Sequence, residues 1–164
     1  MDLLLELPLN RLSLAQFGYN ILRELYNRGD NVGVFPIGVN ERGEGLDLSC
    51  YRPTQDFMKW LQGSIDKRFQ LLKRDTKSLK IWHLAGSESL RTPNQVLSTF
   101  YECSSPSDYE KTIVALQKKT LFSSNYSAEK FAGAGNVGNF LVGLTPISLQ
   151  EEIKNIFPIR PVGA

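Results

Sequence analysis

The sequence has few of the residues that hold metals or form disulfides. Its 164 residues include two cysteines, Cys50 and Cys103, and one histidine, His83. The cysteines form no CxxC pair, and a single histidine cannot complete a zinc site with them. We therefore expect two reduced thiols, as in a cytoplasmic protein, with no metal and no tightly bound cofactor.

Long hydrophobic runs and a strong charge of one sign are also missing. No run of about 18 apolar residues occurs, so no segment is expected to cross a bilayer. The first ten residues carry Asp2 and Glu6 but no basic region ahead of the leucines, which favours a buried first strand over a signal peptide. The formal net charge is +2, too small to indicate a nucleic-acid partner.

What the chain does contain is an alternation of apolar strands and amphipathic helices. Strands are predicted at residues 3–9, 32–37, 79–84, 95–101, 120–123 and 140–144, and helices at 14–27, 54–73, 107–118 and 127–133. This order predicts an α/β fold, a Rossmann-like parallel sheet of about six strands with helices on both faces. We assign residues 1–144 to this domain and 145–164 to a C-terminal tail with a short helix at 149–156.

The predicted helix ends rest on a few capping residues. Ser13 is expected to cap the first helix with Gln16 at the capping-box position, and Arg28-Gly29 is expected to end it. Ser127 is expected to cap the last short helix. The second helix carries an apolar stripe that should face the core, made of Phe57, Trp60, Leu61, Ile65, Phe69 and Leu72.

A parallel sheet binds ligands at the carboxyl ends of its strands, so the loops there are the candidate sites. The loop after the first strand contains Asn10, Ser13 and Gln16 but lacks GxGxxG and the Walker lysine motif. Tight NAD or ATP binding is therefore not expected. The N–H groups of the helix start could hold an anion or a sugar hydroxyl, and the structural alternative is an ordinary capped helix.

The loop after the third predicted strand contains His83, Gly86, Ser87 and Glu88. A histidine at a strand end can act as a general base or donate a hydrogen bond to a bound hydroxyl, and a carboxylate can also act as a general base. The alternative is a histidine that only ends the strand. No GxSxG elbow accompanies it, so a hydrolase triad is poorly supported.

A third polar loop follows the fifth predicted strand and contains Ser123, Ser124 and Asn125. Its hydroxyl and amide groups suit a polyol ligand and suit helix capping equally well. Separately, a basic run could meet anionic lipid or a phosphate, although such a run is more often a solvated helix face. The run consists of Lys67, Arg68, Lys73, Arg74, Lys77 and Lys80.

Three stretches together resemble the N-terminal domain of GT-B glycosyltransferases, nearest to the large retaining family 4 and its phage-encoded versions. They are LAQFGYNILRELYNRGDNVGVFPIG, IWHLAGSES and LFSSNYSAEKFAGAG, and the resemblance covers about residues 2–144. It implies sugar transfer from a nucleotide sugar to an acceptor hydroxyl on a sugar or lipid, with this domain on the acceptor side. The family's donor-binding second domain has no counterpart in these 164 residues, so a second domain or a homo-oligomer is expected to complete the site.

The resemblance also implies roles for the candidate residues. Asn10, Ser13 and Gln16 would lie near the donor diphosphate or the acceptor, and Ser123, Ser124 and Asn125 would close the cleft. The acceptor side would be lined by Gly86 and Ser87, with His83 and Glu88 as the catalytic pair. Two alternatives stay open: a non-catalytic interaction protein built on a half-fold, viral or part of a complex, and a small flavodoxin-like nucleotide-binding enzyme.

Overall fold

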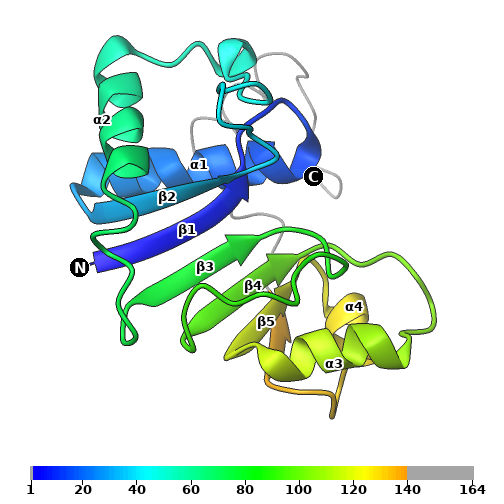
Figure 1. Cartoon of the computed structure of the whole chain (residues 1–164). Coiled ribbons are helices and arrows are strands. Elements are labelled where there is room, and N and C mark those ends of the chain that lie inside the picture. The colour runs from blue at the N-terminus through cyan, green and yellow to red at the C-terminus, as the bar shows by residue number, and fades with distance from the viewer. Residues whose placement is uncertain (1, 140–164) are drawn as a thin grey trace, which may run out of the picture.

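The computed structural model describes residues 2–139 and shows a single six-stranded parallel sheet with helices on both faces (Figure 1). The strands are β1 (Asp2–Pro8), β2 (Asn31–Ile37), β3 (Lys77–Ile81), β4 (Gln95–Thr99), β5 (Lys119–Phe122) and β6 (Val137–Asn139). The helices are α1 (Ser13–Arg28), the short 3-10 helix η1 (Ser49–Tyr51), α2 (Gln55–Asp66), α3 (Asp108–Leu116) and α4 (Asn125–Lys130). The predicted fold class is confirmed, whereas the predicted strand at 140–144 and the predicted tail helix lie outside the described residues.

The strand order is β2-β1-β3-β4-β5-β6, and every neighbouring pair is parallel. The chain therefore steps outward once, from β1 to β2, and afterwards only in the opposite direction from β1. The change of direction falls between β1 and β3, the place where open parallel sheets leave a crevice for ligands.

The two faces of the sheet are covered differently. On one face, here called the α1 face, a Cβ on Gly18 of α1 would lie 2.5 Å from Leu7 and 3.5 Å from Ile81, so the bare glycine lets this helix lie close to β1 and β3. On the opposite face, here called the α3 face, Leu97 and Phe122 pack with the buried residues of α3 and α4. Between β3 and β4 on the α3 face no helix intervenes, and residues 82–94 cross as an irregular loop (Figure 1).

Several element ends differ from prediction. The N-cap of α1 is Leu12, with no side-chain bond, and Ser13 is the first helical residue, so the predicted Ser13 cap is wrong. Gly29, with φ of 71°, ends this helix as predicted. Ser124 rather than Ser127 caps α4, because its hydroxyl accepts a bond from the Ser127 N–H.

The second helix is shorter than its apolar stripe predicts. Thr54 caps it and Asp66 is its last residue, seven residues before the predicted end at Lys73. The chain continues as a series of turns, so Phe69 and Leu72 leave the helical stripe and are exposed. Strand β3 also ends earlier than predicted, at Ile81, which places His83 in the following loop.

Candidate functional site

The three predicted polar loops all lie at the carboxyl edge of the sheet. They follow β1, β3 and β5 respectively, and β1 and β3 are adjacent at the change of strand direction. The first two loops therefore flank the same crevice position, while the loop after β5 lies two strands farther along. The topology brings the predicted residues to one edge, and the side-chain contacts decide which of them are available there.

The loop after β1 uses two of its three candidate side chains to hold its own shape. The Asn10 Oδ1 accepts a bond of 2.9 Å from the Leu12 N–H, and the Gln16 Nε2 donates one of 2.9 Å to the Arg11 carbonyl. Ser13 is exposed, and the start of α1 has no side-chain cap. The first N–H groups of α1, rather than Asn10 or Gln16, are the open donors of this loop.

Residues 38–53 brace this first loop. The Tyr51 hydroxyl donates to the Asn10 carbonyl at 2.6 Å, and the Asp47 N–H donates to the Leu9 carbonyl at 2.9 Å. The Tyr51 ring also stacks on the ring of Tyr19, with centroids 4.0 Å apart. The long loop at residues 38–53 therefore fixes the backbone of the first one.

Tyr51 makes the stability of this loop sensitive to alkaline pH. Burial, with the nearby Cys50 thiol second, raises the pKa of the Tyr51 hydroxyl above its ordinary value, so the fold favours the neutral phenol. Its contribution to stability is fully present below about pH 10 and is lost as pH rises through the raised pKa. Because burial also raises the pKa of Tyr19 and Tyr101, Tyr51→Phe should reduce, not abolish, the fall in unfolding free energy above pH 10, measured by urea denaturation across pH. If the free energy of unfolding of Tyr51→Phe fell as steeply with pH above pH 10 as that of the unmodified chain, this account would be contradicted.

The loop after β3 holds the four candidates in very different settings. Ser87 is buried, and its hydroxyl donates to the His83 carbonyl at 2.5 Å. Gly86 has φ of +92°, and a Cβ there would lie 2.8 Å from the Trp82 indole nitrogen, so only glycine fits this turn. Both residues shape the loop: Gly86 has no side chain to offer a ligand, and the Ser87 hydroxyl is buried in its bond to His83.

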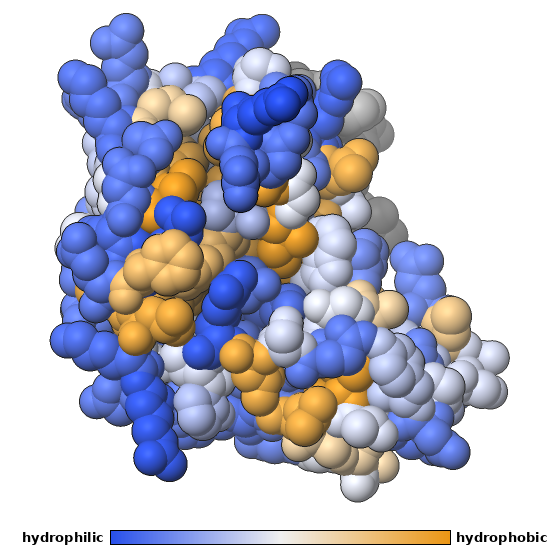
Figure 2. Space-filling model, in the orientation of Figure 1, coloured by the Kyte–Doolittle hydropathy of each residue, from blue (hydrophilic) through white to orange (hydrophobic). Residues whose placement is uncertain are grey.

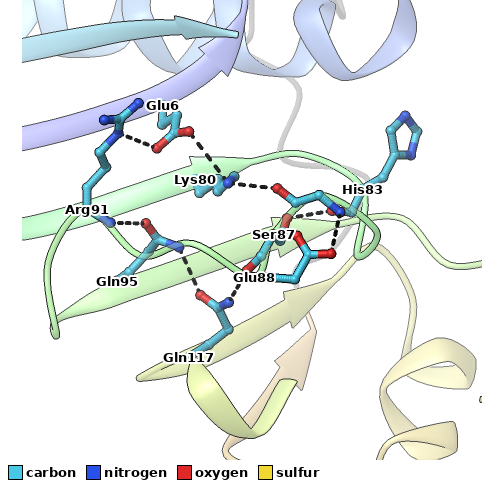
Figure 3. A network of polar contacts seen from close by, with 9 residues as sticks. Glu6, Lys80, His83, Ser87, Glu88, Arg91, Gln95 and Gln117 are labelled. Carbon is cyan, nitrogen blue, oxygen red and sulfur yellow. Dashed lines mark hydrogen bonds and ion pairs between the residues drawn. The ribbon is translucent and has the colours of Figure 1, made fainter. Parts of the chain in front are cut away.

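The predicted pair His83 and Glu88 is not brought together. His83 is exposed, its ring packs edge-on against Trp82 with centroids 5.1 Å apart, and its imidazole points away from the polar network (Figure 3). The Glu88 Oε1 accepts a bond of 3.3 Å from the Gly86 N–H. Within residues 2–139 no hydrogen bond or ion pair joins the two side chains, so each would have to act separately on a ligand.

Beneath this loop lies a polar network that the sequence reading missed. Lys80 is 2% exposed, and its Nζ lies 3.5 Å from a Glu6 oxygen and donates to the Gly86 carbonyl at 3.0 Å. The other Glu6 oxygen accepts a bond of 2.8 Å from the Arg91 Nε (Figure 3). Lys80 therefore does not belong to the solvated basic run in which it was placed.

Two buried glutamines extend the network to the far end of the loop. The Arg91 N–H donates to the Gln95 side chain at 3.1 Å, Gln95 donates to Gln117 at 3.1 Å, and Gln117 donates to the Ser87 carbonyl at 3.0 Å (Figure 3). A loop laid on a sheet face has backbone groups that no helix satisfies, and these side chains satisfy them instead. The one visible signal was Glu6, a lone acid within the apolar run of the first strand.

The loop after β5 is mainly a helix start. Ser124 caps α4, and the Asn125 amide donates to Glu129 at 2.8 Å. Ser123 is half-buried, and its N–H donates to the Thr99 carbonyl at 3.2 Å. The capping alternative therefore accounts for Ser124, while the Ser123 hydroxyl stays at the edge without a hydrogen bond to any residue in 2–139.

No cluster of three or more His, Cys, Asp or Glu side chains able to hold a metal occurs in the part of the chain that the structure describes. Over the same residues, no helix is long and apolar enough to cross a membrane. Comparison of the chain with protein-family models, curated proteins and solved structures gives no match.

Proposed function

We propose that the chain is the acceptor-side half of a GT-B-type glycosyltransferase and works with a second domain or a second chain. In the reaction, the acceptor hydroxyl oxygen bonds to the anomeric carbon and loses its proton, while the nucleoside diphosphate leaves with the bonding electrons. The observation that carries the proposal is the change of strand direction between β1 and β3, where these adjacent strands lead into the uncapped start of α1 and into the loop at residues 82–94.

The exposed groups of this edge suit a hydroxylated and anionic ligand. Uncapped N–H groups at the start of α1 favour a phosphate or a sugar hydroxyl. The exposed His83 imidazole and Glu88 carboxylate can accept the proton of an acceptor hydroxyl. Lys80 and Gln117 donate hydrogen bonds to the carbonyl groups of Gly86 and Ser87, and these bonds fix the loop backbone that carries His83 and Glu88.

The test is shift-perturbation NMR of the full chain with UDP-, GDP- and ADP-sugars and with free sugars, supported by thermal shift. A ligand at 100 times its dissociation constant should stabilise the fold by about 2.7 kcal/mol. We expect ligand-induced amide shifts in the loops after β1 and β3. The double substitution His83→Ala with Glu88→Gln should weaken the ligand affinity measured from these shifts at least about tenfold. The matched control, Glu24→Gln at an exposed position of α1, should bind as the unmodified chain does. Absence of shifts in both loops with every ligand would contradict the proposal.

A second candidate is a non-catalytic interaction protein, and a specific observation favours it. Four candidate side chains form hydrogen bonds within the protein, as is typical of residues with a structural role. They are Asn10, Gln16, Ser87 and Ser124. Self-association in ultracentrifugation without any sugar-nucleotide binding would support this reading. A monomer that binds a nucleotide sugar would count against it.

A further inference from the structure

The α3 face of the sheet is thinly covered over β1 and β2. No described helix packs there, and the cover is the turn segment after α2: a Cβ on Gly33 would lie 3.0 Å from the Arg68 Cα and 3.4 Å from Leu71. The core beneath it is a cluster of only three buried residues, Leu4, Phe35 and Leu71. Figure 2 shows apolar surface over this region, left of centre, interleaved with hydrophilic side chains.

Two large apolar side chains of this segment face outward. Phe69 is 62% exposed and Leu72 is 37% exposed, although both lie within six residues of the end of α2. The Phe69 ring meets the buried Phe35 ring edge-on with centroids 5.3 Å apart, so it is held upright against the sheet. Exposed apolar side chains that are packed in place against the sheet are typical of an interaction surface.

Positive charge is concentrated in the same segment. Residues 67–77 carry five cations, Lys67, Arg68, Lys73, Arg74 and Lys77, against one carboxylate, Asp75, a net charge of +4. Because the whole chain carries +2, all other residues together carry −2. Asp66 and Asp2 border the segment and still leave its surroundings positive. Residues 67–77 are therefore a positively charged segment in a protein whose net charge is small.

Aromatic rings hold two arginines of this surface in place. The Arg91 guanidinium lies 4.1 Å from the centre of the Phe35 ring, and the Arg68 guanidinium lies 4.6 Å from that of Phe69. Arg91 donates through Nε to Glu6, and Arg68 donates through Nη1 to the Ile65 carbonyl. The remaining guanidinium N–H groups of both arginines have no hydrogen-bond partner within residues 2–139, so they are available as donors beside exposed apolar groups.

We propose that this surface, made of Arg68, Phe69, Leu72, Lys73, Arg74 and Arg91, docks the protein on an anionic phospholipid bilayer. Phe69 and Leu72 enter the boundary between headgroups and acyl chains, and the cations meet lipid phosphates. A mixture of exposed apolar and basic side chains fits a bilayer, which presents negatively charged headgroups over apolar acyl chains. The proposal is independent of sugar transfer and places the chain on a membrane without spanning it.

The test is flotation of the full chain with vesicles of phosphatidylcholine alone and with 30% phosphatidylglycerol, about the proportion needed to give a clearly negative surface. We expect binding to the anionic vesicles only, weakened by high salt. Lys73→Gln with Arg74→Gln should weaken the partition constant about 20- to 30-fold, at about 1 kcal/mol for each cation. Phe69→Ser with Leu72→Ser should weaken it at least about tenfold.

Matched controls separate this surface from general attraction. Lys59→Gln with Lys111→Gln removes the same charge from exposed sites on α2 and α3, and Tyr109→Ser with Leu116→Ser removes exposed apolar groups from α3. Both control variants should bind nearly as the unmodified chain does. Equal loss in control and surface variants, absence of binding to both vesicles, or equal binding to both would overturn the proposal. So would self-association without lipid that Phe69→Ser with Leu72→Ser abolishes, because the surface would then serve a second copy of the chain.

Discussion

Replacement of Glu6 by leucine is expected to lower the free energy of unfolding by about 3–5 kcal/mol. Glu6 is the carboxylate between two cations, and Lys80 is 2% exposed with its remaining bond to a carbonyl oxygen. Removing the carboxylate leaves a buried ammonium without a counter-charge and frees Arg91 from the sheet. Urea denaturation followed by tryptophan fluorescence measures the loss directly.

A double-mutant cycle distinguishes the ion pair from simple loss of packing. Lys80→Met should cost less than Glu6→Leu, because Glu6 keeps Arg91 at 2.8 Å. The double variant should be clearly more stable than the sum of the two losses predicts, because it removes both partners and leaves no buried charge alone. As a control, Lys118→Met removes an exposed hydrogen bond with Asn94 and should cost under about 1 kcal/mol. Strict additivity of Glu6→Leu and Lys80→Met would contradict this account.

Replacement of Phe131 by alanine is expected to cost about 3–5 kcal/mol by leaving a cavity. Phe131 is 0% exposed, stacks on Phe122 with centroids 4.8 Å apart, and meets Tyr101 edge-on at 4.8 Å. It follows directly after α4, a helix of six residues with little other buried surface. The variant should therefore loosen α4 and the Ser123–Asn125 turn together, visible as lower urea resistance and as amide shifts in that turn.

Tyr126→Ala provides the control for this second prediction. Tyr126 lies on the same short helix but is 55% exposed, and its ring contact is with Lys130 at the surface. Its loss should change stability by less than about 0.5 kcal/mol. If the two variants were equally stable, the cluster around Phe131 would not be what fixes this end of the sheet.

The overall fold could be predicted because hydrophobic periodicity reports burial one segment at a time. The stripe of α1 buries one side of the helix, and the first strand is buried on both faces as a continuous apolar run, so both are visible in the sequence. The end of α2 was not visible, because Phe69 and Leu72 keep the helical spacing after the helix has stopped. Spacing alone cannot tell a core stripe from an exposed apolar pair that follows it.

The candidate site could be predicted only to the level of loops. Strand order brings the carboxyl ends together whatever their side chains are, so the position of the three loops at one edge could be predicted. The partner of each polar side chain depends on contacts between distant segments, such as Gln117 with Ser87 and Glu6 with Arg91, which are 30 and 85 residues apart in the chain. Lys80 was grouped with a basic run expected to be a solvated helix face, whereas the structure buries its side chain.

The all-parallel order also constrains how the chain acquires its structure during synthesis. The first strand, with Leu3 paired to Val32 on one side and to Lys77 on the other, completes its pairing only after β3 has been made, 74 residues later. Until then the backbone edge of β1 that faces away from β2 has no partner. Folding that depends on such distant pairings is slow and leaves apolar edges exposed to other chains. We therefore expect the nascent chain to need protection until about residue 81 has left the ribosome, and truncations that end before β3 to aggregate.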